Sequence, residues 1–184
     1  MKISANAIAA PNIALIKYWG KRNDLLKLPL NDSVSFTLDK KKIWTRTKLI
    51  ISDEFKKDDF YLNGKKCEDG NIKEWLKLVR KRLGKKYPKV KWRIKITSRN
   101  NFPSSAGIAS SASGFAAASA ALCSALKIKS KKEMSIIARL GSGSASRSVF
   151  GGFVRWKKGK RKDGNDSYSV QIAKKKHWNE IVDV

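Results

Sequence analysis

Alternation of apolar and polar positions predicts several β-strands along this chain. Residues 1–10 alternate weakly, residues 33–38 and 44–52 alternate more regularly, and residues 91–97 alternate strictly. A period of two residues places alternate side chains on one face of a strand, so each segment is expected to turn one face toward a core. We expect 33–38 and 44–52 to be antiparallel neighbours. The segment 60–64, F-Y-L-N-G, is typical of a hairpin.

Helical spacing follows in three segments. Across residues 71–83, apolar residues recur on one face, with lysines and arginines opposite. An alanine-rich segment predicts a helix that ends near Leu126, because alanine has the highest helix propensity. Residues 131–140 predict another helix, whereas the glycine- and serine-rich segment 141–147 predicts a loop.

The order of these elements indicates an α+β or α/β class. Residues 152–156 and 168–173 predict two more strands joined by a charged turn, so strands come first and then alternate with helices. Residues 181–184 look like the beginning of a further strand. Since a domain usually finishes with an anchored element or a polar tail, we expect this sequence to be a fragment.

The length of 184 residues suffices for one domain with a substantial core. No apolar run approaches the roughly 18 residues of a membrane span, and the N-terminus does not resemble a secretory signal. Cys67 and Cys123 fit neither a disulfide framework nor a zinc site, which favours a reducing cytosol. We therefore expect a cytoplasmic protein.

The net charge of +26 implies that a partner, substrate or missing portion is acidic. Three interpretations remain open: nucleic-acid binding, a polyphosphate substrate in a basic cleft, or a lysine-rich surface offset by an acidic segment outside the sequence. The lysines are scattered from Lys40 to Lys176. This spread favours a solvated surface over a single binding stripe.

The segment 100–115, N-N-F-P-S-S-A-G-I-A-S-S-A-S-G-F, is rich in small residues and hydroxyls. It leads into the alanine-rich helix, and a helix N-terminus offers unpaired N–H groups and a partial positive charge that suit a phosphate. Gly107 and Gly114 let the backbone approach a ligand, and the serines add donors. A close-packed helix without a ligand is an equal alternative. Neither Walker-A nor G-x-G-x-x-G spacing is present.

Residues 17–22, K-Y-W-G-K-R, place three cations and two aromatic rings around Gly20. This combination suits an anion-binding corner. Lys17 lies in the apolar run I-A-L-I-K-Y-W, where an unpaired lysine is costly to bury, and this favours a functional role. The alternative is a strand end with ordinary surface lysines.

Residues 141–148, G-S-G-S-A-S-R-S, combine four hydroxyls and two glycines with Arg147. Backbone N–H groups, hydroxyls and a guanidinium can together wrap an oxyanion. The alternative is a flexible linker, although linkers seldom lead directly into a run such as V-F-G-G-F-V-R-W. His177, the single histidine, is expected on the surface, so Ser-His-Asp hydrolysis is poorly supported, and the sequence contains no metal-ligand cluster.

Three of these stretches, in this order, resemble the diphosphomevalonate decarboxylases of the GHMP kinase superfamily. The matching segments are A-P-N-I-A-L-I-K-Y-W-G-K-R at 10–22, N-N-F-P-S-S-A-G-I-A-S-S-A-S-G-F-A-A at 100–117 and G-S-G-S-A-S-R-S-V-F-G-G-F-V at 141–154. Residues 29–38 and 163–173 fit the same family, so the resemblance covers essentially the whole sequence.

The resemblance implies a two-layer α+β fold, the GHMP-kinase-like N-terminal domain, over residues 1–184, truncated before a C-terminal domain. Strands within 1–10, 33–52 and 91–98 would carry the helices on one face. The family reaction is ATP-dependent: the tertiary hydroxyl of mevalonate 5-diphosphate is phosphorylated, then phosphate and carbon dioxide leave to give isopentenyl diphosphate. Phosphoryl transfer rests on positioning and charge neutralisation, so glycine loops, hydroxyls and cations suffice.

The resemblance also implies cofactors, partners and site residues. ATP and Mg²⁺ would be the cofactors, and a homodimer would be possible, without membrane or nucleic acid as a partner. The reacting centre would include Arg147, Lys17 and Asn12, with Ser111 near the nucleotide phosphates and Mg²⁺. The substrate site would be lined by Tyr18, Trp19, Gly20, Lys21, Ser142, Gly143, Ser144, Ala145, Ser146 and Arg147. The ATP phosphates would lie against Pro103, Ser104, Ser105, Ala106, Gly107, Ile108, Ala109, Ser110 and Ser111.

Two departures from the family pattern affect these expectations. The family's catalytic aspartate lies in a D-x-G-x-N-type segment of its C-terminal half, which this sequence lacks, so we expect the 184-residue chain alone to be inactive. A substrate-contacting arginine expected before the first long helix is also absent, and Lys73 is a weak stand-in. The number of phosphates on the substrate stays open, so a phosphomevalonate decarboxylase or a mevalonate 3-kinase is the first alternative. A basic nucleic-acid-binding α+β module is the second.

Overall fold

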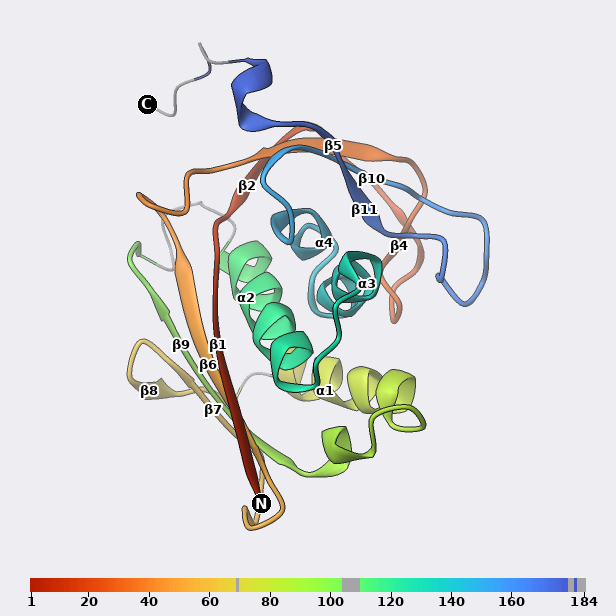
Figure 1. The fold of residues 1–184 in the computed structure, drawn as a ribbon. Helices are drawn as coiled ribbons and strands as arrows, with labels where there is room; N and C mark the ends of the chain where they lie inside the picture. Colours follow the sequence, from red (N-terminus) through yellow and green to blue (C-terminus); the bar gives the residue numbers. More distant parts are fainter. Residues whose placement is uncertain (69, 104–109, 179–180, 182–184) are drawn as a thin grey trace.

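The computed structural model describes residues 1–68, 70–103, 110–178 and 181 of the chain. Its helices lie between two sheets, which Figure 1 shows on either side of α2, α3 and α4. The first sheet has the strand order β1-β6-β9-β7-β8. Its members are β1 (Lys2–Ala9), β6 (Thr45–Ser52), β9 (Arg93–Asn100), β7 (Asp59–Leu62) and β8 (Lys65–Lys66).

The second sheet has the strand order β11-β10-β5-β2. Its members are β11 (Ser169–Ala173), β10 (Gly152–Trp156), β5 (Ser33–Thr37) and β2 (Asn12–Ile16), and a separate hairpin joins β3 (Lys21–Asn23) to β4 (Leu28–Pro29). The helices are α1 (Gly70–Leu83), α2 (Ser110–Ala125), α3 (Lys131–Gly141) and α4 (Ala145–Ser148), with 3-10 turns η1 (Pro88–Lys91) and η2 (Lys175–His177). Among these helices, none combines the length and apolar character that crossing a membrane would need.

The α+β class is confirmed, and helices cover one face of the first sheet as expected. The strand 33–38 is nevertheless not the neighbour of 44–52: β5 pairs with β2 and β10, whereas β6 pairs with β1 and β9. The buried positions of the two strands explain the separation. In β6 the inward residues are Leu49 and Ile51, but in β5 they are Ser33 and Ser35, all fully buried. Alternation shows that a strand has two faces, yet it does not choose the strand's partner.

The main core forms between the first sheet and α1, α2 and α3. Alternate residues of the sheet, such as Leu49 and Ile94, point into it and are fully buried. Trp75 of α1 is also fully buried, and its indole Nε1 donates to the Ile137 carbonyl of α3 at 3.0 Å. A buried indole N–H needs such an acceptor, so this bond fixes α1 against α3.

Small residues let α2 approach its neighbours closely. Its buried positions include Ala112, Ala116 and Ala117, and it contacts β1, β6, α3 and α4. An ideal Cβ built on Gly141, the last residue of α3, would lie 2.1 Å from Cδ1 of Phe115 in α2. Glycine is therefore required where the end of α3 meets the beginning of α2.

Several local predictions are confirmed and one is wrong. The helix 71–83 and the hairpin at Asn63-Gly64 are present, and both turn residues have positive φ, 50° and 80°. The segment 141–147 is not a loop throughout, because Ala145–Ser148 forms the short helix α4. The strand expected at 181–184 falls mostly outside the described residues, and Ile181 belongs to no element.

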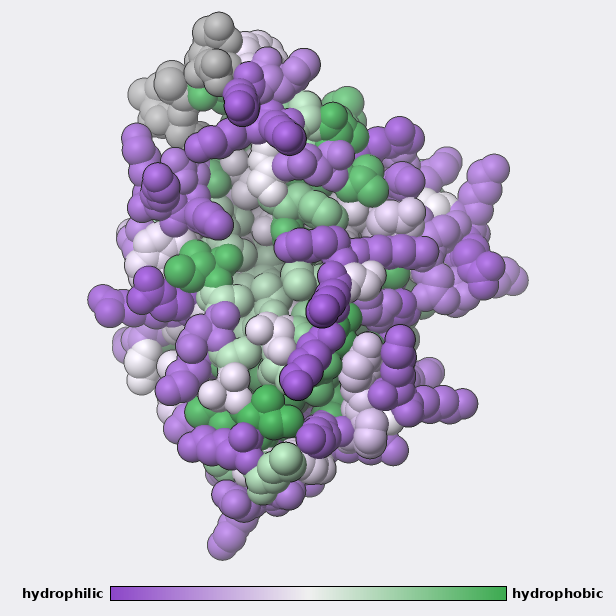
Figure 2. Space-filling view, viewed as in Figure 1, coloured by the Kyte–Doolittle hydropathy of each residue, from purple (hydrophilic) through white to green (hydrophobic). Residues whose placement is uncertain are grey.

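Hydrophilic side chains project around the whole outline of the face in Figure 2, rather than along one stripe. This distribution agrees with the scatter of lysines along the sequence.

Asp58, which precedes β7, ties α1 to the first sheet. Its two carboxylate oxygens each accept from the Arg80 guanidinium at 2.8 Å, and Oδ1 also accepts the Ile94 N–H at 2.8 Å. Burial by itself would raise the pKa of the Asp58 carboxyl, but the bonds from Arg80 and Ile94 outweigh it and lower the pKa. The ionised carboxylate therefore stabilises the fold at neutral pH.

We predict that Asp58→Asn lowers the free energy of unfolding at pH 7 by roughly 2 kcal/mol, the typical loss of hydrogen bonds to a charged group. The folded-state pKa lies below the unfolded value, so this contribution is present above about pH 4 and is lost as pH falls through the folded pKa. Urea denaturation at pH 7 and pH 3 would measure both values. The control is Asp59→Asn, because Asp59 lies 4.0 Å from Lys66 Nζ in a looser pair. An equal loss at both pH values for Asp58→Asn would contradict the account.

Candidate functional site

Arg147 of α4 is a buried cation surrounded by uncharged acceptors. It is 2 % exposed. Its Nε donates to Ser35 Oγ at 2.9 Å and to Asn12 Oδ1 at 3.3 Å, and its Nη1 donates to Ser33 Oγ at 2.5 Å. Its Nη2 donates to no residue in the described part of the chain. The guanidinium thus retains donor capacity for a ligand.

The pKa of Arg147 reflects the lack of a counter-charge. Burial lowers this pKa from an ordinary 12.5 to about 10, because the charged form has lost hydration. Arg139 is equally buried, with a pKa also lowered to about 10. It differs because its guanidinium donates to the backbone carbonyls of Leu26, Gly164 and Ser167. Arg139 is therefore engaged in holding loops, whereas Arg147 is the cation that an anion would best stabilise.

Asn12 of β2 anchors α4 beside the second sheet. Its Nδ2 donates to Ser148 Oγ at 2.7 Å and to the Ser144 carbonyl at 3.0 Å, while its Oδ1 accepts from Arg147. One buried amide therefore contacts both ends of the short helix. This arrangement places Asn12 as a positioning residue for Arg147.

Two aromatic rings form a wall beside Arg147. Tyr18 packs edge-on against Trp156 with ring centroids 4.8 Å apart, and the Arg147 Cζ lies 5.9 Å from the Trp156 ring centroid. Trp156 is fully buried, and its Nε1 donates to Ser167 Oγ at 3.2 Å. The two rings shield one side of the Arg147 guanidinium from water, and the Trp156 ring also offers it a cation–π contact.

A row of serine hydroxyls joins the two glycine–serine segments of the sequence. Ser111 Oγ, at the start of α2, lies 3.4 Å from Ser142 Oγ, which lies 3.1 Å from Ser144 Oγ. Ser111 is exposed, whereas Ser142 is half-buried. The start of α2, within segment 100–115, therefore lies beside segment 141–147.

The remaining members of the 17–22 segment do not join this group. Lys17 is exposed, as are Leu15 and Ile16 at the end of β2. The lysine is therefore not embedded in an apolar environment, and the cost of burial gives no argument for its function. Trp19 is 86 % exposed, and Gly20 lies against Leu30. Lys21 Nζ pairs with Asp24 at 2.7 Å, and neither lysine has a hydrogen bond or ion pair with the Arg147 group in the described part of the chain.

Most of the expected ATP-binding loop cannot be placed. Ser104, Ser105, Ala106, Gly107, Ile108 and Ala109 lie outside the described residues. Pro103 is exposed, Ser110 is half-buried and begins α2, and its carbonyl accepts from Ser113. What the structure supports here is the position of the helix N-terminus beside Ser142.

Sequence reasoning missed Ser33, Ser35 and Trp156. Ser33 and Ser35 are fully buried on one face of β5, whereas Val34 and Phe36 on its other face are only half-buried. A strand whose inward positions are hydroxyls is unusual for a core. That reversed pattern in S-V-S-F was the available signal for a polar site.

The described residues contain no group of three or more His, Cys, Asp or Glu side chains that could hold a metal ion. Ser111, the residue that the resemblance places near Mg²⁺, offers one hydroxyl oxygen. Mg²⁺ commonly keeps several waters and binds through substrate phosphates with few protein ligands. The donor set fits a metal carried by a nucleotide rather than one caged by the protein.

Gly143 is required where the aromatic wall meets the serine row. An ideal Cβ on it would lie 2.8 Å from both Trp156 Cη2 and the Tyr18 hydroxyl. We predict that Gly143→Ala displaces Tyr18. The change should weaken binding of mevalonate 5-diphosphate, the substrate that the resemblance implies, about tenfold, equivalent to roughly 1.4 kcal/mol. Calorimetric titration would measure this affinity. Gly151→Ala is the control, because nothing lies within 4 Å of its ideal Cβ; equal affinities for the two variants would show that Gly143 is not critical.

Comparisons with known proteins found similar sequences and similar structures. The family model for the diphosphomevalonate decarboxylase-like N-terminal domain matches residues 9–169. A curated diphosphomevalonate decarboxylase of Ganoderma lucidum is 49% identical over 96% of this chain and 47% of the relative. The Staphylococcus aureus mevalonate diphosphate decarboxylase structure has a TM-score of 0.84 and 43% identity, covering 94% of this chain and 51% of that one.

A structure described as MDDEF in complex with MVAPP, AMPPCP and magnesium is also similar, with a TM-score of 0.83 and 42% identity. The match covers 94% of this chain and 51% of that one. The chain therefore spans about half the length of the curated relatives and solved structures it matches.

Proposed function

Because the chain belongs to the diphosphomevalonate decarboxylase-like N-terminal domain family, we propose that it provides the substrate-binding half of a diphosphomevalonate decarboxylase. The reaction would be the ATP-dependent conversion of mevalonate 5-diphosphate into isopentenyl diphosphate, ADP, phosphate and carbon dioxide, in the mevalonate pathway of isoprenoid biosynthesis. We further propose that residues 1–184 act as one domain in the cytoplasm and can form a homodimer.

One observation carries this proposal: Arg147 is buried beside serine hydroxyls and an amide, with no carboxylate partner in the described chain. A buried cation of this kind is costly in the free protein, and it gains most from an anion with several oxygen acceptors. A substrate that carries a carboxylate and a diphosphate supplies such acceptors. The aromatic wall and the serine row limit where this anion can lie.

The chain's own residues would act by orientation and charge. Arg147, held by Asn12, Ser33 and Ser35, would bind the substrate's anionic groups, while Ser142 and Ser144 would donate hydroxyl hydrogens to them. Ser111 and the N-terminus of α2 would lie toward the nucleotide phosphates, as N–H groups at a helix start favour negative charge. ATP with Mg²⁺, when bound, supplies the phosphoryl group and the neutralisation of its charge. Positioning of this kind provides much of the catalysis in phosphoryl transfer.

Turnover would need more than these residues. The family's catalytic aspartate is carried by a segment that is not in the 184-residue sequence, so we propose that this chain alone binds substrate without converting it. Formation of ADP and carbon dioxide by the purified 184-residue chain would refute this proposal.

Titration of the chain with mevalonate, its 5-phosphate and its 5-diphosphate by calorimetry is the test of the function. The proposal expects the 5-diphosphate to bind most tightly and mevalonate to bind least. Preference for the 5-phosphate would favour a phosphomevalonate decarboxylase instead. The test is needed because the charge of Arg147 does not by itself determine how many phosphates the substrate carries. Equal affinity for all three ligands would overturn the assignment of the site.

A further inference from the structure

A second basic cavity lies between α1 and the beginnings of β7 and β9, away from the Arg147 site. Its volume is about 460 Å³, which is within the range of small-molecule sites. It is lined by Lys56, Lys57, Asp58, Phe60, Lys73, Leu76, Lys77, Arg80 and Arg93. None of these residues belongs to the group around Arg147, and Figure 1 shows α1 and β7 below α4 and β10. Lys73, the stand-in for the family's substrate-contacting arginine, lies in this lining and not in the group around Arg147.

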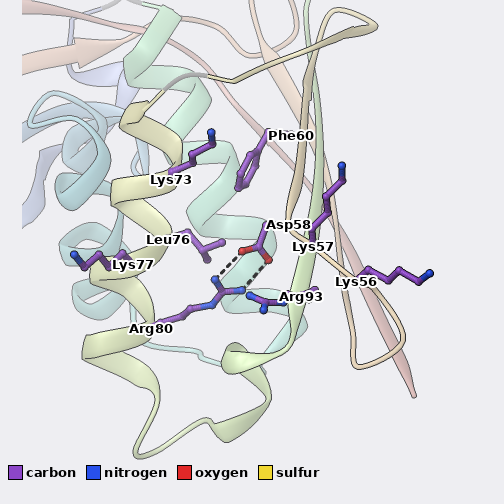
Figure 3. A pocket seen from close by; sticks show the side chains of 9 residues that line it. All are labelled: Lys56, Lys57, Asp58, Phe60, Lys73, Leu76, Lys77, Arg80 and Arg93. Atoms are coloured by element: carbon purple, nitrogen blue, oxygen red, sulfur yellow. Dashed lines mark hydrogen bonds and ion pairs between the residues drawn. The ribbon is translucent and has the colours of Figure 1, made fainter.

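The inner wall of the cavity is firmly built. Arg80 donates to both oxygens of Asp58 and also to the carbonyls of Val90 at 3.1 Å and Trp92 at 2.8 Å. Figure 3 shows this ion pair at the base, with the Arg93 guanidinium beside it. A wall fixed by several charge-assisted bonds is preorganised, which lowers the cost of binding a ligand.

The basic side chains that line the cavity outnumber its carboxylates. Asp58 is the single carboxylate of the lining, and Arg80 and the Ile94 N–H already engage it. Lys57 and Lys73 make no hydrogen bond or ion pair in the described part of the chain, and in Figure 3 they stand on opposite sides of Phe60. Lys73 and Lys77 are also four residues apart on α1, a spacing at which like charges repel. A multivalent anion would relieve this repulsion.

Phe60 and Leu76 form the buried floor of the cavity, with exposed fractions of 5 % and 1 %. The lysine and arginine side chains around them supply both apolar stems and positive charge. The excess of cations favours an anion, because a concave basic wall concentrates positive potential.

We propose that this cavity is a second anion site, distinct from the Arg147 site, which binds the phosphate chain of a small polyphosphate. Lys57, Lys73 and Arg93 contact the phosphate oxygens, and the Asp58–Arg80 pair holds the wall in place. The phosphate chain can be that of inorganic polyphosphate or of a nucleoside triphosphate, since the recognised chemistry is the same.

Calorimetric titration of the Arg147→Met chain tests the proposal, because that background removes the main cation of the proposed substrate site and leaves only the proposed nucleotide site at the α2 N-terminus to be distinguished from the cavity. The probes are inorganic tripolyphosphate, ATP and AMP at low ionic strength, each titrated with and without the further change Lys57→Gln/Lys73→Gln. We expect this lysine change to weaken tripolyphosphate and ATP binding at the cavity, while ATP binding at the α2 N-terminus remains. A larger effect of the lysine change on ATP than on tripolyphosphate would identify a nucleotide as the ligand, whereas tripolyphosphate binding that the lysine change leaves unaltered would overturn the proposal.

The variant Lys57→Gln/Lys73→Gln should weaken tripolyphosphate binding about tenfold or more. Its control is Lys85→Gln/Lys129→Gln, which removes the same charge from two other exposed lysines. Equal losses in both variants would mean that the whole basic surface attracts anions, and the cavity would not be a site. Thermal melting of each variant at the titration conditions checks that it is folded, which we expect because none of these lysine side chains makes a hydrogen bond or ion pair in the described chain.

Discussion

Replacing Arg147 with methionine should weaken binding of mevalonate 5-diphosphate roughly a hundredfold or more, because truncating one side of a buried charge pair typically costs 2–5 kcal/mol. The same change should leave thermal stability within about 1–2 kcal/mol of the wild type. Burial lowers the pKa of Arg147 to about 10 from 12.5, a shift equivalent to roughly 3 kcal/mol against the charged form. Methionine removes that penalty, which offsets the lost hydrogen bonds to Ser33, Ser35 and Asn12.

The direction of the pH effect follows from the same shift. At this one group, the unfolded chain binds more protons than the folded chain only above about pH 10. The contribution of Arg147 to stability therefore rises with pH only there, and the full penalty applies at neutral pH. Calorimetry for affinity and differential scanning for stability would separate the two consequences. Arg155→Ala is the charge-matched control, since Arg155 is half-exposed and pairs with Asp32. If Arg147→Met bound mevalonate 5-diphosphate as tightly as the wild type, Arg147 would not be part of the substrate-binding site.

Gly141→Ala should destabilise the protein by roughly 2–3 kcal/mol and weaken ligand binding with it. Helix propensity alone predicts the opposite sign, a gain of up to about 1 kcal/mol for Ala over Gly. The difference arises because the new Cβ would lie 2.1 Å from Cδ1 of Phe115, and overpacking of a closed interface typically costs 1–3 kcal/mol. Either the Phe115 ring moves or α3 shifts away from α2.

Two further variants make this prediction specific. Gly114→Ala, in α2 itself, has nothing within 4 Å of its ideal Cβ, so it should stabilise the helix slightly. In a Phe115→Ala background the cost of Gly141→Ala should largely disappear, a coupling that a double-mutant cycle measures. Additive effects of Gly141→Ala and Phe115→Ala would show that the contact between α2 and the end of α3 does not hold the two segments together.

The sequence predicted the elements well because they depend on local chemistry. Period-two alternation, the alanine series and the Asn63-Gly64 turn each act over a few residues, and their elements are present. Sheet membership was harder, since 33–38 and 44–52 are joined by a short segment yet belong to different sheets. Sheet membership depends on packing between strand faces that are distant in sequence, which local alternation does not reveal.

The site was predicted in part for the same reason. The motif resemblance named Asn12, Ser111, Ser142 and Arg147, and hydrogen bonds connect Asn12 to Arg147 and Ser111 to Ser142; their roles stay predictions. It did not reveal Ser33 and Ser35, because buried hydroxyls in a short strand have no motif of their own. Lys17 was expected to be embedded, but it follows β2, an edge strand whose own Leu15 and Ile16 are exposed.

A crystal structure of this chain with mevalonate 5-diphosphate and a non-hydrolysable ATP analogue tests the central claim most directly. The account predicts one continuous site, with the substrate's anionic groups at Arg147, Ser142 and Ser144 and the nucleotide phosphates at the α2 N-terminus beside Ser111. Substrate bound elsewhere, for example between Lys57 and Lys73 with Arg147 untouched, would contradict it.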